Sequence, residues 1–220
     1  MTSDLDRSWQ RLLHGVRAFR RDVFPAQRAL YEVLAAQGQR PHTLLVTCAD
    51  SRIDPELLTQ AGPGEVFVAR NIGNLVPAYG EMLGGVSAVI EFAVAALGVS
   101  HIVVCGHTDC GAVKGLLDPG SVACMPTVRR WLRNAEAALS VVEARHTGAP
   151  PGVFMERLVE ANVLLQLDHL RTHPSVAGRL ARGTLALHGW VYDIATGAVR
   201  MYDPELGGFE QINPQSATTG

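Results

Sequence analysis

Apolar residues gather in short runs, which are separated by polar turns and by longer segments with helical spacing. The runs are rich in β-branched residues and have the length of strands. In two of them, Leu44-Leu45-Val46 and Ile102-Val103-Val104, every position is apolar, which is typical of parallel strands covered on both faces. We expect four main strands and a weaker fifth, at Thr43–Thr47, Val66–Ala69, His101–Cys105, Thr184–Tyr192 and Ala198–Tyr202.

Segments with the 3.6-residue period of amphipathic helices lie between these runs. The segments Gly115–Pro126 and Thr147–Gly152 are rich in turn residues and are expected to be loops. Pro174 is expected to stop the helix that precedes it. The periodicity predicts helices at Pro25–Ala36, Gly84–Leu97, Thr127–Ala144 and Val153–Thr172.

Strands that alternate with helices predict an α/β fold: a mostly parallel sheet of four strands with flanking helices. Asp193–Gly197 carries a hairpin signal, so an antiparallel edge strand should close the sheet. No linker divides the chain, and residues 1–220 are expected to form one domain with an N-terminal helical arm over about residues 1–40. Within the arm, Arg7–Arg21 is amphipathic and packs either on its own domain or on a partner subunit.

Composition narrows the classes of function. Hydrophobic residues make up 47% of the 220 residues, enough for a substantial core, and 19 basic residues nearly balance 21 acidic ones. Because the charges are scattered, nucleic acid is not the expected partner. The start lacks a signal-peptide pattern, and the longest apolar segment, Val86–Leu97, is too short to span a membrane. A cytoplasmic protein without a membrane anchor is therefore expected.

Three candidate metal ligands follow predicted strands. Cys48 ends the first strand, and His107 and Cys110 follow the third. The carboxyl ends of parallel strands border one crevice, so the three side chains should converge there. Two Cys sulfurs and one His nitrogen leave one position open on a tetrahedral zinc ion, which is the ligand count of a catalytic site. The alternative is that both cysteines fill the core and His107 is a hydrogen-bonded core histidine; the joint arrangement favours the metal.

The remaining cysteines and a histidine pair are weaker candidates. Cys105 lies within a predicted strand and is interpreted as a core residue, while Cys124 lies in a loop without a companion ligand. His169 and His173 are four residues apart and share a helix face, but no acidic third ligand accompanies them. A solvated or interfacial face is expected for that pair.

A carboxylate and a guanidinium follow the first ligand. Arg52 can hold Asp50 by two parallel hydrogen bonds and keep it ionised. Asp50 could then accept the single O–H of a zinc-bound hydroxide, or it could ligate zinc itself. The alternative role is an ordinary helix cap, because Asp50 and Ser51 precede a short predicted helix that begins at Pro55. Both roles are compatible.

The motifs Cys48-x-Asp50-Ser51-Arg52 and His107-x-x-Cys110-Gly111 together resemble the β-class carbonic anhydrases of plants and bacteria. The resemblance extends from about Arg17 to Asp203. It includes three further stretches, Pro63–Asn71, Gly84–Ala88 and His188–Asp193.

The resemblance implies one Zn²⁺ per chain, held by Cys48, His107 and Cys110, with Asp50 and Arg52 as the catalytic pair. The family reaction is the reversible hydration of CO2 to bicarbonate and a proton by zinc-bound hydroxide. Zinc lowers the pKa of its bound water, as it does in carbonic anhydrases with three histidine ligands. Two thiolates donate more charge than imidazoles do, so activity is expected to rise toward alkaline pH.

The resemblance also implies a small apolar substrate pocket at a subunit interface, and a homodimer or a multiple of dimers. Gln39 would donate a hydrogen bond to a substrate oxygen, as would the backbone N–H of Gly111. Phe67 and Ile72 would line the pocket. The chain departs from the family pattern at Phe92, where tyrosine is common, and at Ala96, where some members carry a histidine linked to proton transfer.

A regulatory bicarbonate pocket in some family members is built from Trp, Arg and Tyr. Arg70 and Tyr192 match it, but Leu45 replaces the tryptophan. We therefore expect an incomplete pocket, with Asp50 paired to Arg52 and the fourth zinc position open.

Two alternatives remain from the sequence: a carbonyl sulfide or carbon disulfide hydrolase with the same ligands, and a non-catalytic, zinc-stabilised bicarbonate-binding protein. The intact Asp50–Arg52 pair argues against the second alternative, because a non-catalytic protein has no need to keep a buried charge pair.

Overall fold

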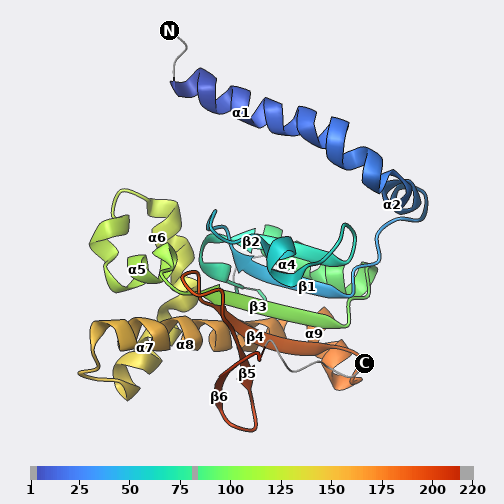
Figure 1. Cartoon of the computed structure of the whole chain (residues 1–220). Helices are drawn as coiled ribbons and strands as arrows, with labels where there is room; N and C mark the ends of the chain where they lie inside the picture. Colours follow the sequence, from blue (N-terminus) through green and yellow to red (C-terminus); the bar gives the residue numbers. More distant parts are fainter. Residues whose placement is uncertain (1–3, 81–83, 214–220) are drawn as a thin grey trace. The chain divides into compact units, whose positions relative to one another are not determined.

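The computed structural model describes residues 4–80 and 84–213, and the chain divides into two compact units, Met1–Gln39 and Arg40–Gly220 (Figure 1). The first unit consists of α1 (Asp4–Ala18), a π-helical turn η1 (Phe19–Val23) and α2 (Phe24–Gln37). None of its described residues is buried. Large apolar side chains, among them Trp9, Leu12 and Val16, are more than half exposed along α1.

A six-stranded sheet forms the centre of the second unit, in the order β2-β1-β3-β4-β5-β6. The first four strands in that order are parallel, and β5 and β6 are antiparallel additions at one edge. The parallel sheet with an antiparallel edge confirms the predicted fold class. The strands are β1 (Thr43–Cys48), β2 (Val66–Asn71), β3 (His101–His107), β4 (Ala186–Tyr192), β5 (Val199–Asp203) and β6 (Gly208–Gln211).

The sixth strand corrects the expected sheet, which had four parallel strands and one edge strand. β6 has four residues and a single apolar side chain, Phe209, so it shows no alternation that could have predicted it. Its partner strand supplies the missing contact: the rings of Phe209 and Tyr202 lie 5.4 Å apart. Gly207, with a φ of 66°, closes the turn between the two strands.

Helical segments connect the strands. They are α3 (Pro55–Thr59), η2 (Ile72–Asn74), α4 (Gly85–Glu91), η3 (Phe92–Ala96), α5 (Gly111–Leu117), η4 (Pro119–Val122), α6 (Pro126–Leu132), η5 (Arg133–Ala135), α7 (Glu136–Arg145), α8 (Pro151–Thr172) and α9 (Pro174–Ala181). Among the described residues, no helix is both long and apolar enough to cross a membrane.

One helix prediction and one loop prediction need correction. The helix expected over Thr127–Ala144 is interrupted by the 3₁₀ turn η5, which separates α6 from α7. The loop expected over Gly115–Pro126 contains the end of α5 and the turn η4. Pro174 ends α8 as predicted, but it also occupies the first turn of α9, where proline is favoured because the first N–H groups of a helix need no internal partner.

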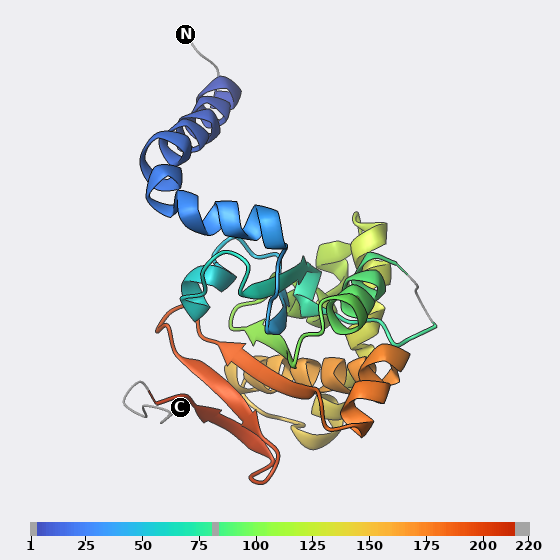
Figure 2. The ribbon, with the colours of Figure 1, turned by 90° about the vertical axis from the view of Figure 1, so that its right-hand side faces the viewer.

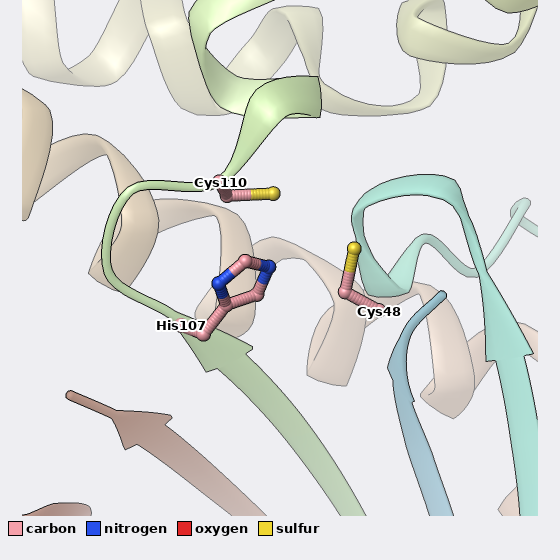
Figure 3. A group of neighbouring side chains, drawn as sticks. All are labelled: Cys48, His107 and Cys110. Carbon is pink, nitrogen blue, oxygen red and sulfur yellow. The ribbon is translucent and has the colours of Figure 1, made fainter. Parts of the chain in front are cut away.

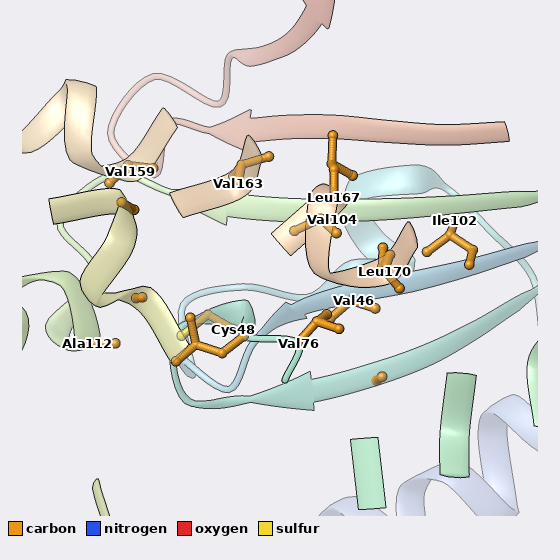
Figure 4. Close-up of a cluster of buried hydrophobic side chains, with 14 of the residues drawn as sticks. Val46, Cys48, Val76, Ile102, Val104, Ala112, Val159, Val163, Leu167 and Leu170 are labelled. Atoms are coloured by element: carbon orange, nitrogen blue, oxygen red, sulfur yellow. The ribbon is translucent and has the colours of Figure 1, made fainter. Parts of the chain in front are cut away.

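The main core lies between the sheet and α8, which runs alongside it in both views (Figures 1 and 2). Two glycines allow this close approach. A Cβ on Gly106 of β3 or on Gly189 of β4 would lie 2.8 Å from a methyl group of Val163. Figure 4 shows the buried layer, in which Val159, Val163, Leu167 and Leu170 of α8 accompany strand side chains and Cys48.

The opposite face of the sheet carries a smaller cluster of Leu45, Val103 and Cys105, with Trp190 and Tyr192 packed against it. The central residues of β1 and β3 are therefore buried on both faces, as their continuous apolar runs predicted. Cys105 is 1% exposed, which confirms its interpretation as a core residue. Cys124 is exposed in the segment between η4 and α6.

Candidate metal centre

Cys48, His107 and Cys110 come together at the carboxyl edge of the sheet (Figure 3). Cys48 is the last residue of β1, His107 is the last residue of β3, and Cys110 directly precedes α5. One ligand atom from each lies within 4.8 Å of the other two, and all three residues are buried. They are the one such group of three or more among the described residues. The convergence expected from the strand order is therefore present in the structure.

The hydrogen bonding of His107 leaves one ring nitrogen available. Its side chain is fully buried, and Nδ1 donates to the carbonyl oxygen of Thr108 at 2.8 Å. With the proton on Nδ1, Nε2 carries a lone pair, and it has no hydrogen-bond partner among the described residues. An orphaned buried nitrogen beside two sulfurs is what a metal-ligating imidazole requires, because the second nitrogen of such a ligand is normally fixed by a hydrogen bond.

The two thiols influence each other. Their mutual hydrogen bond lowers the pKa of Cys48, and the same interaction, together with burial, raises the pKa of Cys110. The N–H of Gly73 also donates to the sulfur of Cys48, at 3.4 Å. The first negative charge is thus stabilised in the pair, whereas a second buried thiolate needs a cation beside it. Both effects favour a divalent metal ion at this position.

Asp50 and Arg52 form the predicted pair. Asp50 accepts from Nε of Arg52 at 2.9 Å, from Nη2 at 2.7 Å and from the backbone N–H of Arg52 at 3.0 Å. These hydrogen bonds hold the pKa of Asp50 well below its usual range, and they raise the pKa of Arg52. The carboxylate is therefore ionised and has a fixed orientation two residues beyond a ligand.

The capping role considered for Asp50 and Ser51 belongs to another residue. Asp54 caps α3, and its side chain accepts from the N–H of Leu57 at 3.0 Å. The correction follows from spacing: Pro55 occupies the first turn of α3, so the residue directly before it is the cap. The side chain of Asp50 does not cap α3 and pairs with Arg52.

A second carboxylate, which sequence reasoning missed, joins the two motifs. Nη1 of Arg52 donates to Asp109 at 2.7 Å, and Asp109 also pairs with Lys114. The Arg52 contact, with Lys114 second, lowers the pKa of Asp109 to about 2. Arg52 thus ties the segment after β1 to the turn that carries His107 and Cys110. The acidic residue between the two ligands was visible in the sequence, but its partner lies 57 residues away.

Arg70 completes the support. Its side chain donates to the carbonyl oxygens of Cys48, at 3.2 Å, and of Asp50, at 2.7 Å. Arg70 therefore holds the backbone on which the first ligand and the carboxylate stand. Tyr192 packs against the small cluster that contains Leu45.

The comparisons with known proteins agree with this geometry. A sequence model described as carbonic anhydrase matches residues 43–199, a range that contains all three candidate ligands and the Asp50–Arg52 pair. The chain belongs to the β-carbonic anhydrase family. The carbonic anhydrase of Pseudomonas aeruginosa is 49% identical over 192 residues, which are 87% of this chain and 86% of that protein.

Solved β-carbonic anhydrase structures share the fold. The β-carbonic anhydrase CcaA superposes with a TM-score of 0.90 at 42% identity, covering 93% of this chain and 100% of that one. One of two tetrameric β-carbonic anhydrases from the filamentous ascomycete Sordaria macrospora superposes with a TM-score of 0.75 at 29% identity, covering 93% of this chain and 99% of that one.

The residues that the β-carbonic anhydrase resemblance assigns to the substrate pocket lie on several elements. Ile72 lies in η2, immediately before Gly73, and is 43% exposed. Gly111 begins α5 directly after Cys110, and nothing lies within 4 Å of where its Cβ would be. The ring of Phe67, on β2, lies 6.1 Å from that of Phe92. Gln39 ends the first unit and is exposed.

The expectation for His169 and His173 was wrong. His173 is 2% exposed, and its Nε2 donates to the carbonyl oxygen of Pro77 at 3.0 Å, while Nδ1 of His169 donates to that of Val76 at 2.7 Å. The two imidazoles thus satisfy the carbonyl oxygens of two consecutive residues, Val76 and Pro77. His169 lies on α8, but His173 follows its last residue and has an extended backbone, so the two do not share a helix face as their four-residue spacing predicted.

Proposed function

We propose that this protein is a zinc-dependent carbonic anhydrase that catalyses the reversible hydration of CO2 to bicarbonate. One observation carries the proposal: a buried Cys-His-Cys group, whose ligand atoms lie within 4.8 Å of one another, stands beside a carboxylate held by Arg52. A structural zinc site normally has four protein ligands, whereas three leave a position for a reacting molecule.

The residues present fit zinc. Cys48 and Cys110 supply thiolate sulfurs, which zinc accepts readily, and His107 supplies an imidazole nitrogen without another partner. When bound, zinc would lower the pKa of water in the open position and so supply a nucleophile near neutral pH. A content of one zinc ion per chain is part of the proposal.

Asp50 and Arg52 are proposed as the catalytic pair. Because Arg52 keeps Asp50 ionised, the carboxylate would accept the O–H of the attacking hydroxide, but it cannot donate a hydrogen bond. The hydroxide would thereby be oriented with a lone pair toward the carbon of CO2. Arg52 is itself held by Asp109, so it is already in position before substrate arrives.

Substrate binding is proposed for Gln39, Phe67, Ile72 and Gly111. The side chains of Phe67 and Ile72 are apolar, which suits CO2, and the N–H of Gly111 belongs to the first turn of α5, where the helix leaves backbone donors unpaired. Gln39 would supply an amide donor to a substrate oxygen.

A homodimer or a multiple of dimers is proposed for the assembled protein, acting in the cytoplasm. The support is the exposed apolar stripe on α1, since no described residue of the first unit is buried within the chain. The tetrameric β-carbonic anhydrases of Sordaria macrospora favour the same arrangement. Light scattering should give a mass of two chains or a multiple of two, and Leu12→Glu together with Val16→Glu should reduce it.

The deciding experiment is stopped-flow CO2 hydration by zinc-loaded protein on the alkaline side of neutral pH. The blank is Cys48→Ser, which removes a ligand with little change of volume. Rapid turnover that is absent from the blank is expected. Zinc-loaded protein that hydrates CO2 no faster than the blank would overturn the proposal, and carbonyl sulfide and carbon disulfide would then be assayed with the same preparations.

A further inference from the structure

The peptide group between Ile72 and Gly73 joins the metal centre to α6. Its N–H donates to the sulfur of Cys48 at 3.4 Å. Its carbonyl oxygen, which points the opposite way in the same peptide plane, accepts from Nε1 of Trp131 at 2.8 Å. An indole N–H, one peptide group and a ligand sulfur therefore form a continuous hydrogen-bonded chain.

The backbone around this peptide needs outside support. Gly73 and Asn74 both have a left-handed conformation, with φ of 78° and 51°, which glycine and asparagine adopt more readily than other residues do. A Cβ on Gly73 would lie 2.8 Å from the Cβ of Ala112, so the turn presses against α5 immediately after the ligand Cys110. Only a tightly held backbone keeps its N–H directed at the sulfur.

Side chains from three segments provide that support. Within the turn, Asn71 accepts from the N–H of Leu75 at 2.8 Å and donates to its carbonyl oxygen at 2.9 Å. From α8, the buried Asn162 donates to the carbonyl oxygen of Gly73 at 3.2 Å. From α6, Trp131 holds the carbonyl oxygen of Ile72. Of these three side chains, only Trp131 bonds to the peptide that contacts Cys48.

We propose that Trp131 is a positioning residue of the metal centre, which orients and polarises the Ile72–Gly73 peptide so that its N–H withdraws charge from the Cys48 sulfur. The inference rests on the proposed zinc-dependent function and deepens it. It assigns to a tryptophan on α6 a role in setting how strongly the ligand sulfur donates to the metal.

The physical reasoning is that hydrogen bonds in a chain strengthen one another. An indole that draws density from the carbonyl oxygen makes the peptide N–H a better donor. A better donor lowers the charge that the thiolate gives to the metal, and hydrogen bonds to a ligand sulfur tune the metal in this way. A metal that receives less charge from its ligands acts as a stronger Lewis acid toward water.

The test is Trp131→Phe, which keeps an aromatic ring in place and removes the N–H. The first readout is the sulfur-to-metal charge-transfer absorption of the cobalt-substituted protein, which reports the energy of the sulfur electrons without any turnover. It should move to longer wavelength in Trp131→Phe. The second readout is the midpoint of the pH profile of CO2 hydration. We expect a rise of about 0.3 to 0.5 pH unit, which lowers the rate below the midpoint by roughly two- to threefold.

Trp190→Phe is the matched control. Trp190 is also partly buried, but its Nε1 has no hydrogen-bond partner among the described residues, so the same chemical change removes no hydrogen bond. Both readouts should match the wild type. If Trp131→Phe does not fold, Asn162→Ala releases the neighbouring carbonyl of Gly73 and should move both readouts in the same direction.

The outcomes separate the two proposals. A folded Trp131→Phe whose band and midpoint coincide with those of the wild type would overturn the positioning role, even if its melting temperature fell. Wild-type protein that binds neither zinc nor cobalt would instead overturn the proposed function. A shifted band in Trp131→Phe with an unshifted band in Trp190→Phe would support the role of Trp131.

Discussion

The carboxyl edge of β1 and the interior of β3 each hold a buried cysteine, and the two cysteines have opposite chemistry. Cys48 is 5% exposed and Cys105 is 1% exposed. Cys48 interacts with the thiol of Cys110 and the N–H of Gly73, and its pKa is lowered. Cys105 lies among Leu45 and Val103, where burial raises its pKa to about 12. Burial therefore does not decide reactivity; the polar groups around each sulfur do.

Strand position explains this difference. Cys105 is two residues before the end of β3, and the neighbouring strands continue beside it on both sides, pairing it with Thr47 and Trp190. Cys48 is the last residue of β1, where the turn at Gly73 and the segment before α5 supply backbone and side-chain donors. The end of a parallel strand is where polar groups from several segments can meet.

The largest effect is expected from removing one of the proposed ligands. Cys110→Ser should abolish metal binding at stoichiometric zinc and reduce CO2 hydration to the background rate, because the remaining sulfur and imidazole cannot complete the site. Zinc content after gel filtration and stopped-flow rates measure the two effects. Cys124→Ser, which changes an exposed cysteine, is the control and should retain both properties. Full zinc content and turnover in Cys110→Ser would contradict the ligand set.

The next largest effect is expected at the carboxylate beside Cys48. Asp50→Asn should keep zinc but lower the turnover number of CO2 hydration by roughly 10²-fold or more, because the amide no longer forms the ion pair with Arg52 and the nucleophile loses its orientation. The control is Asp54→Asn, because asparagine caps a helix as well as aspartate does. Unchanged turnover in Asp50→Asn would contradict the catalytic role of Asp50.

The three residues that converge in the candidate metal centre, and the strand ends near which they lie, could be predicted from local patterns. Each apolar run marks a strand, and a polar residue directly after a run marks its edge. The Asp50–Arg52 pair was predictable for the same reason, since two residues separate the partners and the chemistry of each is known. Fold class followed from the alternation of strands and helices.

Contacts between distant segments could not be read from these patterns. Asp109, Trp131 and Asn162 act through partners that lie 57, 59 and 89 residues away. An isolated residue of this kind belongs to no repeating sequence pattern from which its distant partner could be predicted. His173 was misassigned because histidine is treated as a polar residue, whereas here its Nε2–H donates to the buried carbonyl oxygen of Pro77. The strand β6 was missed because its stability comes from pairing with β5.

A smaller effect is expected from replacing Cys105, the buried cysteine within β3. Cys105→Ala should lower the free energy of unfolding by about 1 kcal/mol, because it removes one methyl-sized group from a packed cluster. It should leave zinc content and CO2 hydration unchanged, since its sulfur faces the Leu45 cluster. Urea denaturation of the metal-free protein gives the first quantity and elemental analysis the second. Loss of zinc from Cys105→Ala would show that the two cysteines are coupled after all.

The smallest expected effect is on stability at acid pH, and it concerns Asp109, the second carboxylate that pairs with Arg52. The pKa of Asp109 lies below its ordinary value of 3.8, at about 2, because Arg52 and Lys114 favour its charged form. Its contribution to stability is therefore present above pH 3.8 and is lost as the pH falls from there toward 2. Asparagine tolerates the left-handed backbone at this position, where φ is 59°, so Asp109→Asn should change charge without backbone strain.

Urea denaturation of metal-free wild type and Asp109→Asn across this acid range tests the prediction. The stability difference between them should be small and constant near neutral pH, because Asp109 is half exposed and water screens its ion pairs. It should then shrink as the solution is acidified below pH 3.8. A difference that stays constant throughout would mean that Asp109 gains nothing from Arg52, and that Arg52 is positioned by Asp50 alone.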